Sequence, residues 1–302
     1  MDAIYAKALS KSYGGKTVVD NINLIVPEGA IYGFIGRNGA GKTTTQKMVS
    51  GLAGPSGGSV SLFGKPIGKQ DVREQVGVLI EQPALYPELS AYENLVLQGL
   101  NIGIANPKEQ ATKSLQMVEL AEAANKKSKQ LSLGMRQRLG VAIAMMGSPK
   151  LLVLDEPING LDPQGIIEMR GVFERLNQEL GITIFISSHI LGELSRIATH
   201  YGIIHDGRLI QQISAAELSE KGRDYLLVKA SDNQKAGKLI REKFSSSECV
   251  VQGDEVHVFG LSNGRDVNAL LWNNGIAVDA IYLHQQDLEE YFLRLMGGGQ
   301  YA

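Results

Sequence analysis

The chain has 302 residues, of which 43% are hydrophobic, and a formal net charge of −2. This length suffices for one large domain and a smaller one, and the mixed charges exclude the broad basic surface that nucleic acid requires. The apolar runs at 141–146 and 182–186 are far shorter than the roughly 18 to 20 residues of a membrane helix. The N-terminus lacks the apolar core of a signal peptide, so we expect a chain that does not cross the membrane by itself. The single Cys249 has no disulfide partner, which favours a reducing, intracellular compartment and an inert buried thiol.

The first elements in chain order are strands. Between about residues 3 and 35, short β-branched and aromatic runs are broken by Gly14 and Gly15 and by the turn at 27–29, which predicts an antiparallel β region. A glycine loop and a helix follow. From about 85 to 147 the pattern becomes helical: Ser90 and Glu93 form a predicted capping box, and Asn106 precedes a proline that suits a first helical turn. We expect a helical subdomain inserted into an α/β core.

Two continuously apolar runs, at 151–155 and 182–189, predict buried parallel strands joined by a helix at about 164–180, with the functional site at their carboxyl ends. The pattern changes near residue 221. From there short strands and helices alternate, which predicts a small α+β domain over 221–302 beside a first domain over 1–220. The last apolar pattern, DLEEYFLRLM at 287–296, predicts an amphipathic helix of that small core.

A glycine-rich loop carries the strongest motif. Residues 36–44 read GRNGAGKTT, which matches the P-loop pattern of Gly, four residues, Gly, Lys and Thr, between an apolar strand and a helix. Backbone N–H groups of such a loop surround phosphate oxygens, the lysine places its charge on the β and γ phosphates, and the threonine hydroxyl ligates Mg²⁺. We therefore predict ATP and Mg²⁺ as ligands, bound by Gly36, Asn38, Gly39, Ala40, Gly41, Lys42, Thr43 and Thr44.

Two adjacent carboxylates complete the predicted phosphate site. The apolar strand LLVLD delivers Asp155 at its carboxyl end, and Glu156 follows directly. Asp155 is placed to hold Mg²⁺ through water, while Glu156 is placed to polarise the water that attacks the γ phosphate in line. The pair predicts hydrolysis as well as binding of ATP.

The segment LSLGMRQRL at 131–139 separates this chain from other P-loop proteins. It resembles the LSGGQ signature of ABC ATPases and lies about twenty residues before the Asp155 strand. The resemblance, which extends over about residues 3–220, implies that Ser132 and Gly134 contact the γ phosphate held by an opposite subunit. Leu133 and Met135 depart from the family pattern, so the usual glutamine side chain is missing there.

Further positions are similar to ABC motifs in order and spacing. Tyr13 resembles the aromatic residue that stacks on adenine, Asp162 in NGLD resembles the D-loop aspartate that faces the partner subunit, and His189 resembles the switch histidine that senses the γ phosphate. The family's Q-loop glutamine aligns with Glu81, and Gln82 follows. Either Glu81 acts there as a carboxylate ligand of Mg²⁺, which we favour, or the loop uses Gln82 in a shifted register.

The strings LIEQPALYPELSAYENL, DEPINGLDP and SSHILGELSRIA resemble the ATPase subunits of bacterial exporters that protect against bacitracin and lantibiotics. The resemblance implies a peripheral ATPase at the cytoplasmic face of the cell membrane that energises a separate membrane permease. One set of motifs per chain favours a homodimer, although a paired, non-identical ATPase stays open. The alternatives are a soluble ABC ATPase that remodels ribosomes or other proteins and a degenerate domain without hydrolysis. The presence of Glu156 and His189 argues against the degenerate domain.

Overall fold

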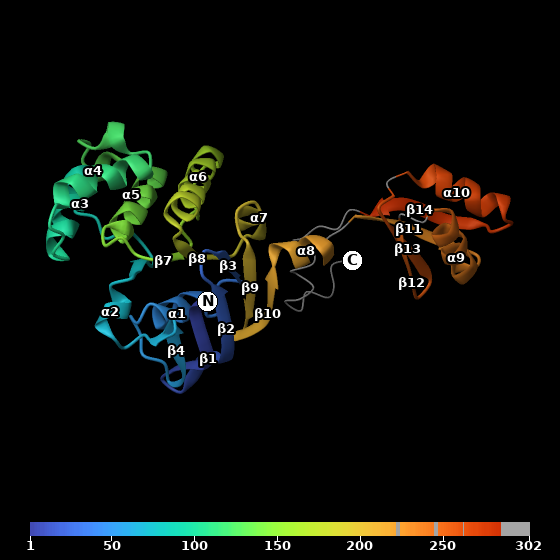
Figure 1. Cartoon of the computed structure of the whole chain (residues 1–302), viewed down its shortest axis with the longest axis horizontal. Coiled ribbons are helices and arrows are strands. Elements are labelled where there is room, and N and C mark those ends of the chain that lie inside the picture. The colour runs from blue at the N-terminus through green and yellow to red at the C-terminus, as the bar shows by residue number, and fades with distance from the viewer. Residues whose placement is uncertain (222–223, 245–246, 262, 285–302) are drawn as a thin grey trace. The chain divides into compact units, whose positions relative to one another are not determined.

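The computed structural model describes residues 1–221, 224–244, 247–261 and 263–284. The chain divides into two compact units, Met1–Ala215 and Ala216–Ala302, whereas the sequence pattern put the change at residues 220–221. Figure 1 shows the helices and strands of both units in chain order. The predicted amphipathic helix at 287–296 lies outside the described residues.

An antiparallel sheet in the order β2-β1-β4-β5 begins the first unit. Its strands are β1 (Asp2–Tyr13), β2 (Lys16–Pro27), β4 (Gly57–Leu62) and β5 (Lys65–Pro66). The tight turn between β1 and β2 consists of Gly14 and Gly15, with φ values of 54° and 82°. Both values are in the left-handed region that two-residue hairpin turns require, which is why two glycines occur there. The predicted N-terminal antiparallel region is confirmed.

The second sheet of this unit carries the site, in the order β10-β9-β3-β8-β7-β6. Its strands are β3 (Ile31–Ile35), β6 (Val76–Leu79), β7 (Leu151–Asp155), β8 (Thr183–Ser188), β9 (His200–His205) and β10 (Arg208–Ser214). All neighbouring strands run parallel except β10, which is antiparallel to β9. Strands β3, β7 and β8 are buried along their whole length. Their carboxyl ends therefore meet at one edge of the sheet, where parallel α/β proteins bind ligands.

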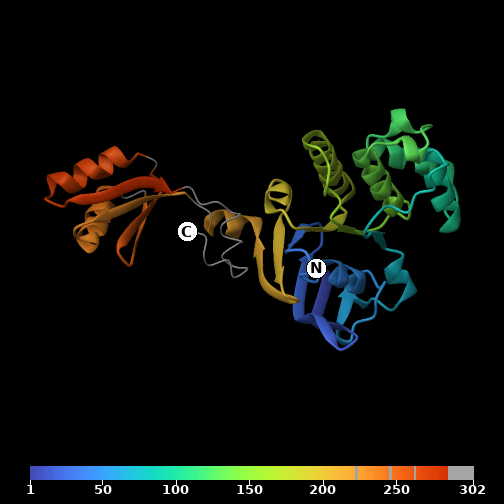
Figure 2. The same ribbon diagram turned by 180° about the vertical axis from the view of Figure 1, so that it is seen from behind.

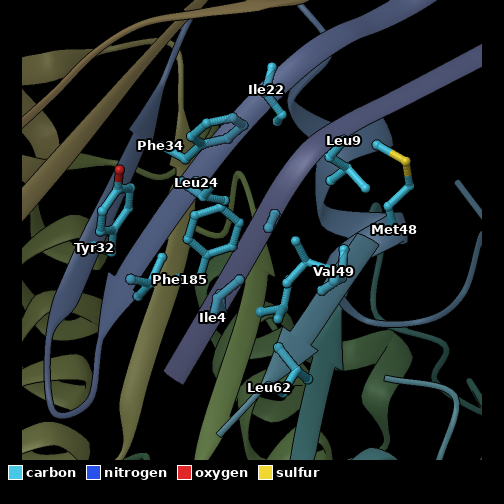
Figure 3. Packing of buried hydrophobic residues seen from close by; sticks show 14 of the residues in the cluster. Ile4, Leu9, Ile22, Leu24, Tyr32, Phe34, Met48, Val49, Leu62 and Phe185 are labelled. Atoms are coloured by element: carbon cyan, nitrogen blue, oxygen red, sulfur yellow. The ribbon is translucent and has the colours of Figure 1, made fainter. Parts of the chain in front are cut away.

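Aromatic and aliphatic side chains from both sheets form one core, shown in Figure 3. The ring centroid of Phe185 lies 5.2 Å from that of Phe34 and 5.6 Å from that of Tyr32. Ile4 and Leu24 from the antiparallel sheet are fully buried in the same cluster. This packing holds β3 and β8 side by side, so the loops at their ends are anchored on a rigid core.

The helices of the first unit are α1 (Lys42–Val49), α2 (Gln70–Arg73), α3 (Ala91–Asn101), α4 (Pro107–Met117), α5 (Leu133–Met145), α6 (Pro163–Leu180) and α7 (Leu191–Leu194), with short 3₁₀ turns at Ala121–Ala123 and Ser128–Gln130. Figures 1 and 2 show α3, α4 and α5 as a group beside α6, which confirms the predicted helical subdomain. The predicted capping box is also present: the Glu93 N–H donates to Ser90 Oγ, and the Ser90 N–H donates to the Glu93 carboxylate. Among the described residues no helix has the length and apolar content to span a bilayer.

The second unit begins within α8 (Ala215–Lys221), and its strands form an antiparallel sheet in the order β12-β13-β11-β14. Its elements are β11 (Tyr225–Ala230), α9 (Asn233–Lys243), β12 (Glu248–Gln252), β13 (Glu255–Phe259), α10 (Gly264–Asn273) and β14 (Val278–His284). Apolar residues of α9 and α10 pack with the sheet in a separate core that includes the buried Cys249. The predicted small α+β fold is therefore confirmed.

Candidate active site

The loop between β3 and α1 has the shape of an anion cradle. Gly39 and Gly41 have φ values of 83° and 104°, which residues with a side chain rarely adopt. Gly36 packs so closely on β9 that an added Cβ would lie 2.4 Å from the Ile204 carbonyl oxygen. The loop backbone is therefore held tightly against the sheet, and only glycine fits at its start.

Helix α1 begins directly after this loop. In the described part of the chain no side chain caps the helix, and its first turn carries no acidic residue. The first N–H groups of a helix have no partner within the helix, and together they favour a negative ligand. An uncapped helix start directly after a glycine turn is thus suited to a phosphate group.

Lys42 places a buried cation across the loop. Its side chain is only 6% exposed, and Nζ donates to the carbonyl oxygens of Gly36, at 2.7 Å, and Arg37, at 3.3 Å. Nζ also lies 3.1 Å from Glu156 Oε1. A buried charge of this kind requires polar partners, and here carbonyl groups and one carboxylate supply them.

Asp155 connects three elements at the end of β7. Thr43 Oγ1, in the first turn of α1, donates to Asp155 Oδ2 at 2.7 Å. Ser187 Oγ, on β8, donates to Asp155 Oδ1 at 2.6 Å. Both oxygens of this buried carboxylate are therefore held by hydroxyl groups, next to the loop that would receive the phosphates.

Glu156 joins Lys42 to His189. Its Oε2 lies 2.6 Å from His189 Nδ1, while Oε1 faces the Lys42 ammonium. The Glu156 backbone has a φ of 46°, an uncommon left-handed conformation for a residue with a side chain. The structure thus brings the predicted base, the predicted switch histidine and the phosphate-loop lysine into one contact chain.

A second carboxylate lies close to His189. Glu193, in α7, accepts a hydrogen bond from Ser188 Oγ at 3.1 Å. Burial raises the pKa of the Glu193 carboxyl, and the Ser188 hydrogen bond opposes that rise. The Ser188 carbonyl also accepts the Gly36 N–H at 3.3 Å, so the end of β8 contacts both sides of the site.

The two candidates for the loop after β6 have different neighbours. Glu81 Oε1 lies 2.7 Å from Lys47 Nζ on α1, and both side chains are at the surface. The hydrogen bond from Lys47 holds the pKa of the Glu81 carboxyl below its ordinary value. Gln82 instead lines a hollow with Arg136 and Gln137 of α5. Of the two, Glu81 is the residue that pairs with α1, the helix that follows the phosphate loop, and like Glu156 it has a left-handed backbone, with φ 67°.

The remaining predicted residues lie away from this contact chain. Tyr13 is half-exposed at the end of β1, and Lys11 Nζ lies 5.0 Å from the centre of its ring. Ser132 caps α5 by accepting the Met135 N–H, with Gly134 in the first turn, and Asp162 caps α6 by accepting the Gly165 N–H. No hydrogen bond links these residues to the phosphate loop within the described residues. The starts of α5 and α6 are therefore each capped by an exposed residue of their own, and they make no hydrogen bond to the phosphate loop among the described residues.

Two residues of the site were not predicted from the sequence. Ser187 touches both Asp155 and the Glu156 backbone, and Lys47 pairs with Glu81. A serine pair before His189 at the end of a buried strand was the available signal for Ser187, because polar residues are unusual in such a strand. Lys47 had no local signal, since its partner lies 34 residues away.

A sequence profile described as "ABC transporter" matches residues 19–159, which include the phosphate loop and the Asp155–Glu156 pair. The bacitracin transport ATP-binding protein BcrA of Enterococcus faecalis is 42% identical over 99% of this chain and 98% of its own length. The chain belongs to the ABC transporter ATP-binding proteins. BcrA of Bacillus licheniformis is also 42% identical, over 96% of each chain. The lantibiotic transport ATP-binding protein SrtF of Streptococcus pyogenes is 44% identical over 67% of this ABC ATPase and 86% of its own length.

Solved structures agree with this family. A dimeric ATP-binding cassette in a post-hydrolysis state with bound ADP and phosphate superposes with a TM-score of 0.64 and 25% identity, over 70% of this chain and 98% of its own. An ATP-binding subunit of an ABC transporter has a TM-score of 0.63 and 28% identity, over 72% and 92% of the two chains. The predicted ABC ATPase fold and the predicted ATPase activity are confirmed.

Proposed function

We propose that this ABC ATPase binds MgATP at the Gly36–Thr44 loop and drives a membrane permease that exports a peptide antibiotic of the bacitracin or lantibiotic class. The single observation that carries the substrate class is the near full-length similarity to two bacitracin transport proteins, which extends through the second unit. A soluble remodelling ATPase has no comparable support.

The donor set beside the phosphate loop suits Mg²⁺. The Thr43 hydroxyl and the Asp155 carboxylate are hard oxygen donors that lie 2.7 Å apart, and the described residues contain no cluster of three or more His, Cys, Asp or Glu side chains. Mg²⁺ typically takes one or two protein oxygens and completes its shell with phosphate and water oxygens. Thr43 and Asp155 would hold the ion, which neutralises charge on the β and γ phosphates when bound. Glu81 would join them only after leaving Lys47.

Hydrolysis follows from the contacts of Glu156. Its carboxylate contacts the Lys42 ammonium and the His189 ring. In our proposal Lys42 and His189 turn to the γ-phosphate oxygens of ATP, which leaves Glu156 to accept a proton from the attacking water. The water oxygen bonds to the γ phosphorus, the bond to the bridging oxygen breaks, and ADP leaves with that oxygen.

The site needs a second chain. Ser132 and Gly134 begin α5 and Asp162 begins α6, and these helix starts suit an opposite phosphate loop better than their own. We propose a homodimer that holds two nucleotides between the loop of one copy and the α5 start of the other, at the cytoplasmic face of the membrane. Tyr13 would stack on adenine. Closure of the dimer by ATP, and its reopening after hydrolysis, would move the permease.

The first experiment is co-purification of the tagged chain from detergent-solubilised cells, with identification of bound membrane proteins. The proposal expects a polytopic partner that stimulates ATP hydrolysis and whose loss sensitises cells to a bacitracin-type or lantibiotic peptide. Recovery of ribosomes or soluble proteins alone would contradict it. The Glu156→Gln chain is the matched control, because it should bind the same partner without turnover.

A further inference from the structure

Ser187 lies at the carboxyl end of β8, directly beside Asp155 in the register of β7 and β8. The residue is fully buried. Its Oγ donates to Asp155 Oδ1 at 2.6 Å and accepts the Glu156 N–H at 3.0 Å. One hydroxyl therefore contacts two consecutive residues that have different proposed roles.

A hydroxyl group can serve both contacts because it has one proton to donate and lone pairs to accept. The donated proton fixes Oδ1 of Asp155, while Thr43 holds Oδ2. With both oxygens held, the carboxylate plane cannot rotate freely. The accepted bond satisfies the Glu156 N–H at the point where the chain leaves β7 with a left-handed φ of 46°. A buried N–H without a partner would be costly, so the same bond supports the conformation that aims the Glu156 side chain.

We propose that Ser187 is a positioning residue for ATP hydrolysis, which aligns the Asp155 carboxylate toward the metal and the Glu156 turn toward the attacking water. The inference rests on the proposed roles of Asp155 and Glu156. Because Ser187 is fully buried, its proposed role is to position these two residues and not to contact the nucleotide. Its role is that of a hydrogen-bond partner of a metal ligand. Removal of such a partner typically lowers metal affinity or activity about 10- to 100-fold.

The test replaces Ser187 in the full-length chain. Ser187→Ala removes both hydrogen bonds, and Ser187→Cys keeps the shape while donating only weakly. ATP affinity is measured with Mg²⁺ and again in EDTA, and the turnover number is measured in Mg²⁺. We expect metal-free ATP affinity within about twofold of wild type for both variants, because Lys42 and the loop are untouched. The gain in affinity on adding Mg²⁺ should shrink about tenfold, and turnover should fall about 10- to 100-fold.

A matched control lies on the same strand. Thr183 begins β8 and is buried, and its Oγ1 accepts the Gly29 N–H at 2.9 Å. Thr183→Val removes a buried hydroxyl far from the phosphate loop, so it should lower the melting temperature while leaving the Mg²⁺-dependent gain and the turnover intact.

Two results would overturn the inference: a normal Mg²⁺-dependent gain and turnover in both Ser187 variants, or an equal loss of both in Thr183→Val. Failure of the proposed function looks different, because the wild-type chain would then show no Mg²⁺-dependent gain in ATP affinity.

Discussion

The contacts of Glu156 allow a quantitative prediction for Glu156→Gln. The substitution keeps the shape but removes the negative charge that faces Lys42 Nζ at 3.1 Å and His189 Nδ1 at 2.6 Å. Loss of a general base typically lowers turnover by about 10²- to 10⁴-fold. ATP binding should persist, because the phosphate loop is unchanged, and the variant should accumulate as a nucleotide-bound dimer.

The same substitution should also change stability in a way that depends on nucleotide. Lys42 is 6% exposed and Glu156 19% exposed, so the nucleotide-free variant leaves a buried cation with carbonyl partners alone. We expect a loss of about 1 to 2 kcal/mol, which corresponds to a melting temperature lower by roughly 2 to 8 °C for a domain of this size. In the proposed mechanism bound ATP supplies phosphate oxygens to Lys42, so most of that loss should disappear when ATP is added.

The assay combines phosphate release, equilibrium binding of ATP, size-exclusion chromatography with ATP, and thermal melts with and without ATP. Glu174→Gln is the matched control, because that carboxylate is exposed on α6 and should alter none of these. Phosphate release by Glu156→Gln at the wild-type rate would refute the assignment of the base. An equal loss of melting temperature with and without ATP would refute the proposed exchange of partners at Lys42.

Three further predictions concern other positions. Gly36→Ala puts a methyl group against the main chain of β9, so we expect about 1 to 3 kcal/mol of lost stability and no ATP binding. Urea unfolding and nucleotide titration measure these two effects. The control Gly171→Ala, in open space on α6, should instead stabilise the chain by about 0.5 to 1 kcal/mol. Lys47→Ala removes the partner that stabilises the Glu81 carboxylate, so the pKa of Glu81 should rise toward its ordinary value in a carboxyl NMR titration, and an unchanged pKa would mean that the pair does not form in solution. Burial raises the pKa of the Cys249 thiol, so a maleimide at neutral pH should label the folded chain much more slowly than the urea-unfolded chain, and equal rates would contradict the buried position.

Short motifs allowed much of the site to be predicted. The phosphate loop, the capping box at Ser90 and the carboxylates after LLVLD involve residues close together in the chain, where backbone geometry follows from residue type. The alternation of strands and helices after residue 221 likewise predicted the second unit, because each element has its own apolar period.

The contacts within the site depended on the order of strands. Ser187 meets Asp155 only because β8 lies beside β7, and Lys47 meets Glu81 only because α1 lies close to the end of β6. Neither pairing has a periodic signal, since the partners are more than 30 residues apart. The choice between Glu81 and Gln82 had the same difficulty, because the two neighbours differ only in where the chain turns after β6.

The sequence by itself determined the family, the phosphate loop and the identity of the acidic pair, because each of these features consists of consecutive residues. Tertiary structure decided which groups hold those residues in place: the left-handed turn at Glu156, the two hydroxyls on Asp155 and the contacts of Lys42. The physical reason is that a hydrogen bond or an ion pair depends on distances of a few ångströms, and such distances between separate strands exist only after the sheet has formed.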